Sequence, residues 1–443
     1  MSERHLRVYA NRSELVSPDG TFQAFDEGGM SPDAKKRYEK ISAELATGYL
    51  EKQILTCRDN YSNLDFSGLA QADKELLDRL VQSVTSEVGR ALVGLTILQL
   101  CVKSIEPEQN IRLHKGSTST RDFSWRDGIS MRSLDKQYVT PVLRQYELLR
   151  LNADGFMMTR TLAENYPYST VYKANIRGAR AEWIKIVEAT ETGALATDVA
   201  LRYLLSQLLN QAENFKKLAG QVIDKIHNLA RSDKINQPWA FGIINYHINR
   251  SDYAARLMEI AMHSLMQAMQ EYQVLPNLTL QPLAQMRSAN KKHGNIGDIE
   301  LLESGQIVES WDAKYGKSYL RDELEELSEK LELHPAIMRA GFVTSCEPER
   351  LDELKPRCEE IADIYGISLE VMTFEEWIAE QFQRALKAAT ASEQEIAIAW
   401  ITAYAESLAQ RRREIAPIDE PCYQWLSTMN EILTEDIPNI PNR

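Results

Sequence analysis

The 443-residue sequence lacks the features that mark several broad classes of protein. No apolar run reaches the length of a membrane span, and the opening Met-Ser-Glu-Arg-His is not a signal peptide. The cysteines are few, odd in number and without a CxxC pair, which indicates reduced thiols rather than a disulfide framework. They are Cys57, Cys101, Cys346, Cys358 and Cys422. We therefore expect a cytoplasmic chain with no membrane partner.

Several catalytic and architectural motifs are missing as well. The sequence has no glycine-rich phosphate loop, no G-x-S-x-G, no internal repeat and no heptad run long enough for a coiled coil. The missing phosphate loop argues against the use of ATP. Hydrophobic residues at 44% and charged residues at 26% are ordinary for a globular protein, and the length suits two or three domains.

Basic residues are outnumbered over the whole chain, which has a net charge of −13. Residues 111–187 reverse this balance with thirteen Lys and Arg against seven Asp and Glu, a local +6 that leaves −19 elsewhere. Because the distribution of charge decides partners more than its total, this basic segment is a candidate DNA-binding surface. The alternative is a basic packing surface against the acidic remainder of the same chain.

A target-recognition element is expected in the basic segment. Thr140-Pro141 predicts the start of a helix running through Leu149, and residues 149–160 predict a hairpin with Ala-Asp-Gly at its turn. A short helix followed by such a hairpin is similar to a winged helix. The side chains expected to contact DNA here are Arg121, Arg126, Arg132, Lys136, Arg150 and Arg160.

The most informative segment lies between residues 298 and 314. Asp298–Leu302 and Ile307–Lys314 predict two strands joined by a turn. Asp312 and Lys314 project from one face of the second strand because side chains alternate, and the hairpin brings Asp298 beside Asp312. Two hard oxygen ligands and an ammonium group suit Mg²⁺ binding beside a phosphate. The alternative is the solvated face of an ordinary hairpin.

The elements around this hairpin alternate between helix and strand. An apolar helix carrying Glu259 precedes it, over residues 252–269. The following residues predict, in order, a helix, a strand, a helix, a strand and a helix over 319–331, 340–345, 349–365, 367–372 and 374–386. This alternation favours an α/β sheet covered by helices.

In the order of its elements and in its residues, the region 250–380 resembles the PD-(D/E)XK nuclease superfamily, and type II restriction endonucleases in particular. The matching residues are Asp298, Asp312 and Lys314, with Glu259 as a candidate for the glutamate that some members carry on a helix. One departure is that Gly297, not proline, precedes Asp298.

The resemblance implies a Mg²⁺-dependent, sequence-specific endonuclease that hydrolyses phosphodiester bonds in double-stranded DNA. Asp298 and Asp312 would hold the Mg²⁺, with the backbone carbonyl of Ala313 as a further ligand. Glu259 would bind the metal or its waters, and Lys314 would orient or deprotonate the attacking water. Such an enzyme belongs to a restriction–modification system, with a cognate DNA methyltransferase as its functional partner.

Other residues near the hairpin have less certain roles. Glu300 is either a substitute metal ligand or a structural acid. Lys291 and Lys292 before the hairpin and Lys317 after it either contact DNA phosphates or belong to solvated loops. His293 has no His or Cys partner at ligand spacing, which argues against a role in binding metal.

We expect a mixed fold with four regions. Residues 1–110 are a helical N-terminal region, and 111–235 combine the winged-helix-like element with a helical pair over 197–229. Residues 236–390 form an α/β, restriction-endonuclease-like domain with a central mixed sheet, and 391–443 are a helical C-terminal region. One active site cuts one strand, so double-strand cleavage predicts a homodimer. Alternative functions are a modification-dependent or repair nuclease and a non-catalytic DNA-binding regulator.

Overall fold

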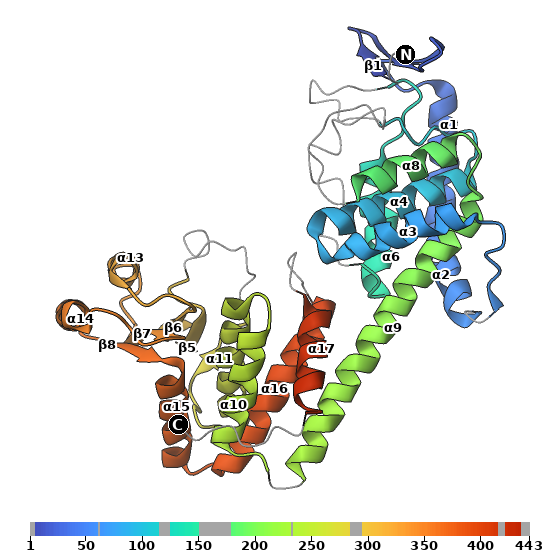
Figure 1. The fold of residues 1–443 in the computed structure, drawn as a ribbon. Helices are drawn as coiled ribbons and strands as arrows, with labels where there is room; N and C mark the ends of the chain where they lie inside the picture. Colours follow the sequence, from blue (N-terminus) through green and yellow to red (C-terminus); the bar gives the residue numbers. More distant parts are fainter. Residues whose placement is uncertain are drawn as a thin grey trace. The chain divides into compact units, whose positions relative to one another are not determined.

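The computed structural model describes residues 5–60, 63–114, 125–149, 179–231, 234–283, 295–414 and 421–435. Within these residues the fold is mixed and mostly helical, with a three-stranded antiparallel sheet and a five-stranded mixed sheet. The chain divides into two compact units, Met1–Asn214 and Phe215–Arg443, which are described separately below (Figure 1). The mixed fold class expected from the sequence is confirmed at this level.

The first unit opens with three strands, which were not predicted within the helical N-terminal region 1–110. The strands β1 (His5–Val8), β2 (Arg12–Val16) and β3 (Phe22–Asp26) form an antiparallel meander. Only the central strand β2 is largely buried, whereas β1 and β3 are mostly exposed. The alternation of apolar and polar residues that predicts a strand is therefore weak in the sequence.

Helices and the loops between them make up the rest of the described part of the first unit. They begin with α1, where the Ser31 side chain accepts a hydrogen bond from the backbone N–H of Ala34 and Pro32 occupies the first turn. The elements are α1 (Pro32–Ala46), α2 (Tyr49–Asp59), α3 (Gln71–Gln82), η2 (Ser83–Thr85), α4 (Glu87–Ile105), α5 (Met131–Leu134), η3 (Asp135–Val139), α6 (Thr140–Gln145), α8 (Arg180–Glu191) and the start of α9 (Thr197–Ala230).

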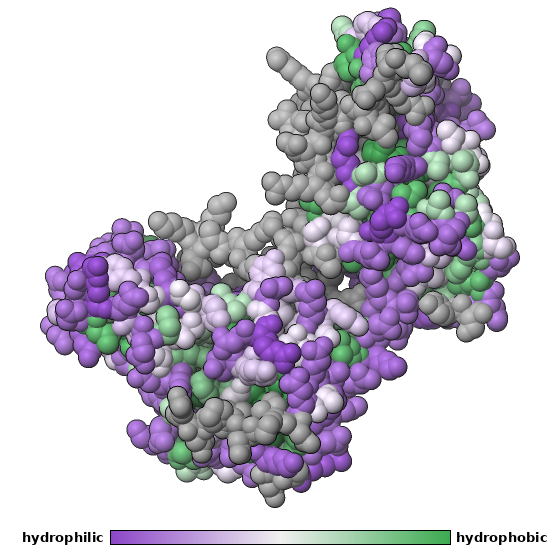
Figure 2. Space-filling model, in the orientation of Figure 1, coloured by the Kyte–Doolittle hydropathy of each residue, from purple (hydrophilic) through white to green (hydrophobic). Residues whose placement is uncertain are grey.

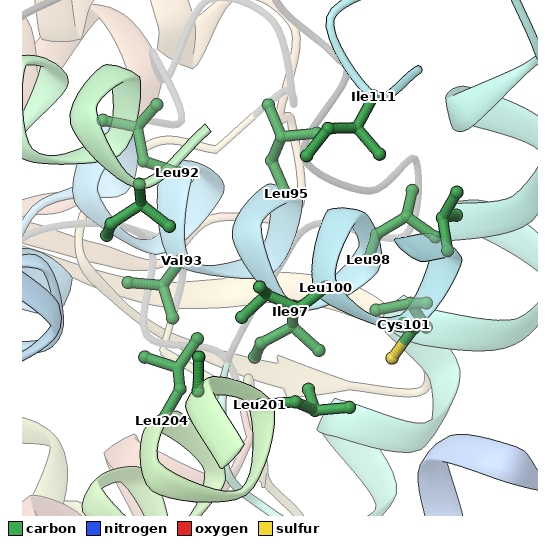
Figure 3. Close-up of a cluster of buried hydrophobic side chains, with 14 of the residues drawn as sticks. Leu92, Val93, Leu95, Ile97, Leu98, Leu100, Cys101, Ile111, Leu201 and Leu204 are labelled. Atoms are coloured by element: carbon green, nitrogen blue, oxygen red, sulfur yellow. The ribbon is translucent and has the colours of Figure 1, made fainter. Parts of the chain in front are cut away.

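The helix α4 forms the centre of the first unit's apolar core. Figure 3 shows its side chains, among them Leu92 and Leu98, above Leu201 and Leu204 of α9. Contrary to the sequence expectation, one segment of the described residues, Val88–Ile105, is long and apolar enough to cross a membrane. In the structure 72% of that segment is buried inside the protein, as in a core helix.

The helix α9 is continuous over Thr197–Ala230, so the predicted helical pair is wrong. Its residues up to Ala212 pack in the core of the first unit, and those from Phe215 pack in the core of the second. Gly220, in the middle, is exposed and has no atom close to the position of a side chain. A glycine there weakens a helix without breaking it.

The second unit is built on the five-stranded sheet, in the order β4-β5-β6-β7-β8. The strands β4, β5 and β6 are antiparallel neighbours, whereas β6, β7 and β8 run parallel. The elements are α10 (Gln237–Arg250), α11 (Ala254–Glu271), β4 (Thr279–Leu280), β5 (Ile299–Glu303), β6 (Gln306–Lys314), α13 (Arg321–Leu331), β7 (Arg339–Thr344), α14 (Leu351–Tyr365), β8 (Ser368–Thr373), α15 (Phe374–Ala388), α16 (Glu393–Glu414) and α17 (Cys422–Ile432). The predicted alternation of helix and strand after residue 298 is confirmed, with ends that move by one or two residues.

Helices cover both faces of this sheet (Figure 1). On one face α13 and α14 pack through a small cluster that includes Leu324, Leu354 and Phe342. On the other, α11, α15 and α16 share a larger core. Residues 391–443 were predicted to form a region separate from 236–390, whereas α16 and α17 contribute to the same core as α11 and the sheet. The surface over α13 and α14, at the left of Figure 2, is strongly hydrophilic.

Candidate functional site

A tight hairpin positions the candidate site residues. Ser304 and Gly305 both have positive φ angles, 51° and 84°, as a two-residue turn of this hairpin type requires. The register pairs Ile299 with Trp311, and the Asp298 N–H donates to the Trp311 carbonyl at 2.9 Å. Asp298 therefore lies immediately before β5, beside Asp312 near the end of β6.

The carboxyl group of Asp298 is held against β6. Its Oδ2 atom accepts a hydrogen bond of 3.0 Å from the Ala313 N–H, and it lies within hydrogen-bonding reach of the Asp312 carboxyl. Burial raises the pKa of Asp298 well above its usual range, and the negative charges of Asp312 and then Glu259 raise it further. Two acids held this close share a site that favours a cation.

Lys314 completes the group on the same strand. Its Nζ atom lies 2.8 Å from Asp312 Oδ2, and it sits over the ring of Phe342 at 5.7 Å from the ring centre. The side chains of Asp312 and Lys314 are only 13% and 22% exposed. The hairpin thus brings together the three residues that the sequence motif selected.

Glu259 lies on α11, which packs against the hairpin strands β5 and β6. Its negative charge is a smaller cause of the raised pKa of Asp298, after burial and Asp312, and its Oε2 atom is in contact with Nη1 of Arg256 one turn earlier. Arg256 did not feature among the residues chosen from the sequence. The one signal that could have selected it is a basic residue three positions before Glu259 in a helix that is otherwise apolar.

The described residues suit Mg²⁺ better than a metal ion that needs a complete cage of protein ligands. They include no group of three His, Cys, Asp or Glu side chains arranged as a ready-made metal site. Mg²⁺ needs no such cage, since one or two carboxylates and substrate phosphates commonly hold it. In a strand the N–H and C=O of one residue point the same way, so the Ala313 carbonyl is directed toward the Asp298 side of β6. Asp298, Asp312 and the Ala313 carbonyl are therefore suitable ligands for Mg²⁺.

Glu300 has a different task from the pair. Its Oε1 atom accepts hydrogen bonds from the backbone N–H groups of Ile296 at 2.6 Å and Gly297 at 3.4 Å. The side chain is buried, and this burial raises the pKa of Glu300. Of the two roles left open for Glu300, this arrangement favours the structural one, because the carboxylate fixes the loop that leads into Asp298.

Gly297 is required by close packing. A Cβ atom at this position would lie 2.7 Å from both the Ser310 hydroxyl and the Trp311 carbonyl oxygen. Proline, which carries a Cβ and lacks the N–H that donates to Glu300, does not fit here. The absence of proline before Asp298 thus has a local steric cause.

Some of the residues predicted to contact DNA lie within the described part of the chain and the others lie outside it. Arg126, Arg132 and Lys136 are exposed on the first unit, and Lys317 forms an ion pair with Glu323 in the second. The others lie outside the described residues: Arg121, Arg150, Arg160, Lys291 and Lys292.

The winged-helix-like element is described only in part. Its helix is present as α6, which is shorter than expected and ends at Gln145. The hairpin predicted over residues 149–160 lies, from residue 150 on, outside the described residues. The winged-helix arrangement stays a prediction.

Comparison with known proteins adds no family to this geometry. Neither a scan against models of protein families nor a search of curated proteins returns a match to this chain.

Proposed function

We propose that this chain is a Mg²⁺-dependent endonuclease that hydrolyses phosphodiester bonds in double-stranded DNA. The observation that carries the proposal is the convergence of Asp298, Asp312 and Lys314 at one end of the β5–β6 hairpin. The order of the surrounding elements supports it: the helix with Glu259, the hairpin, then α13 and the parallel strand β7. This is the order on which the resemblance to the PD-(D/E)XK nucleases rests.

Each residue has a part in the proposed reaction. Asp298 and Asp312, with the Ala313 carbonyl, would hold Mg²⁺, which supplies the positive charge that stabilises the phosphorane-like transition state. Lys314, fixed by Asp312, would orient a water molecule for in-line attack on phosphorus. The water would form a new bond to phosphorus and give up a proton to solvent, while the phosphorus–oxygen bond to the leaving group would break and the leaving oxygen would take up a proton from solvent. Glu259 would orient water molecules at the edge of the site.

We further propose a restriction endonuclease, acting as a homodimer beside a cognate methyltransferase, since one site cuts one strand. The exposed basic residues Arg126, Arg132 and Lys136 are consistent with a DNA-facing surface on the first unit. A modification-dependent or repair nuclease would share the same site. Digestion of methylated and unmethylated copies of one genomic DNA distinguishes the two.

Incubation of the protein with mixed plasmid DNA and Mg²⁺ tests the proposal. We expect discrete fragments from the wild type and none from Asp312→Ala or Lys314→Ala. Lys40→Ala is a matched control because Lys40 forms an ion pair of similar length, 2.9 Å to Glu106, in the first unit. It should cleave like the wild type. Random smearing would reject the restriction assignment, and DNA binding without Mg²⁺-dependent cleavage would reject the nuclease.

A further inference from the structure

Arg256 is a buried cation beside the candidate site to which the proposed reaction gives no role. Its side chain is 4% exposed, and its Nη1 atom contacts the Oε2 atom of Glu259 one helical turn later. Among the buried residues of α11 it is the only lysine or arginine. Most of the others are apolar and belong to the core of the second unit.

Burying a guanidinium group is costly unless it is paired, and a buried ion pair is often no more stable than well-packed apolar side chains. An apolar residue at position 256 would match its neighbours Leu257 and Met258. The stability of α11 alone therefore does not explain this arginine. Its position does, because α11 packs against β5 and β6, the two strands of the hairpin that holds the acid pair, and Arg256 pairs with the acid of that helix.

The charges of Arg256 and of the site residues together favour the binding of a divalent cation. When ionised, Glu259, Asp298 and Asp312 contribute three negative charges, and Lys314 and Arg256 contribute two positive ones. One negative charge remains, which attracts a divalent cation. With that cation bound the site has one positive charge, complementary to one phosphodiester group.

We propose that Arg256 is a positioning residue that acts through Glu259. It holds the Glu259 carboxylate in a single orientation toward the Asp298–Asp312 pair, so that this carboxylate orders the waters around a bound metal ion. Arg256 itself touches neither the metal nor the DNA. This inference rests on the proposed nuclease function and adds to it a residue beyond the motif.

A double-mutant cycle tests this role, with Arg256→Met, Glu259→Gln and their combination. Arg256→Met keeps a long buried side chain and removes the charge. We expect it to lower the Mg²⁺-dependent cleavage rate by about tenfold or more, the usual effect of losing a residue that orients a metal's surroundings. In the Glu259→Gln background the same change should alter the rate by less than about twofold. Arg256→Lys should restore part of the activity.

A second measurement does not depend on cleavage. Binding of Ca²⁺, measured by titration calorimetry, should weaken in Arg256→Met by a similar factor and only when Glu259 is present. Arg357→Met is the control for a lost arginine ion pair elsewhere in the second unit, since Arg357 on α14 pairs with Glu360 three residues later and also with Glu325 of α13. It should leave Ca²⁺ binding and cleavage unchanged.

The outcomes separate the two proposals. Wild-type protein that binds Ca²⁺ in an Arg256-dependent way but cleaves no DNA would reject the nuclease and retain this role. Active wild type with an equally active Arg256→Met, or with equal losses in both backgrounds, would reject the positioning role alone. An equal loss in Arg357→Met would show a general effect on folding and would also reject it.

Discussion

At the scale of single residues, the most unusual group is Asp298, whose charged form is disfavoured by burial and by two neighbouring acids. Such an arrangement lowers the stability of the unliganded protein, so stability alone does not favour it. Functional sites commonly contain such groups, because a bound cation removes the repulsion between them. The metal-free protein should therefore be less stable than its packing alone allows.

This argument predicts that Asp298→Asn stabilises the metal-free protein. The pKa of Asp298 is higher in the folded than in the unfolded state, so its contribution to stability is full at acidic pH and is lost as the pH rises through the folded value. In EDTA at pH 8 we expect the variant to melt at least about 2 °C above the wild type, and by a smaller margin at pH 5. Differential scanning calorimetry measures both. A variant that melts below the wild type at pH 8 would contradict the electrostatic argument.

A second residue sets a pH limit on the second unit. His247, fully buried, lies between the Trp425 carbonyl at 2.8 Å from Nε2 and the Tyr404 hydroxyl at 2.8 Å from Nδ1. The carbonyl can only accept, so the neutral ring donates from Nε2 and accepts from Tyr404 at Nδ1. Burial lowers the pKa of His247 to about 4. The ring thus joins α10, α16 and α17 in its neutral form.

We predict that this histidine costs the fold stability in acid. Its pKa is lower in the folded state, so stability is full above the unfolded value near 6.5 and falls as the pH drops toward 4. The loss from this group amounts to roughly 3 kcal/mol by pH 4. Urea unfolding between pH 7 and 4 measures it. His247→Gln should be less stable at pH 7 yet lose less stability on acidification, and a slope equal to that of the wild type would contradict the assignment.

At the scale of elements, Trp311 on β6 depends on the strand beside it. Trp311 is paired in register with Gly341 of β7, and a Cβ at Gly341 would lie 2.6 Å from the indole ring and 2.4 Å from the Glu370 carbonyl oxygen. A side chain at position 341 must displace either the ring or β8. Since Trp311 adjoins Asp312, the position of the acid pair depends on this contact.

Two glycine substitutions test this contact. Gly341→Ala should destabilise the second unit by about 1–3 kcal/mol, the usual cost of an overpacked core. Gly220→Ala, at an open position in the middle of α9, should instead stabilise by up to about 1 kcal/mol. Chemical unfolding of both variants gives the comparison. A neutral Gly341→Ala would contradict this prediction, because it would show that the strands around Trp311 can move apart to accept the added Cβ atom.

The elements also show what the sequence can and cannot predict. The alternation after residue 298 was predictable because Leu324, Leu327 and Leu331 repeat at helical spacing and Gly366 ends α14 with a positive φ angle. The hairpin register then followed from its two-residue turn, and with it the meeting of Asp298 and Asp312. The β1–β3 meander and the continuity of α9 were not predictable, because mostly exposed strands and an exposed glycine in a helix leave weak patterns. Arg256 was hidden for another reason: its burial depends on neighbours distant in the sequence.

At the scale of the whole molecule, the two units have separate apolar cores within the described residues. Separate cores unfold as separate cooperative transitions when little else couples them. The proposed metal site lies wholly in the second unit.

We predict two calorimetric transitions, of which a divalent ion raises only one. Saturating Ca²⁺ should shift the transition of the second unit, by an amount set by the ion's concentration relative to its dissociation constant. The same transition should fall in Gly341→Ala. Asp312→Ala should abolish the shift. An ion-induced shift of both transitions, or of the one insensitive to Gly341→Ala, would place the metal elsewhere.

The closed space at Gly297 bears on how the proposed site can be searched for in other sequences. A pattern that demands proline before the first acid would pass over any chain in which the second strand presses its backbone against that position. In this chain the segment that fits is a glycine, then an acid, then a glutamate two places later that ties down the loop.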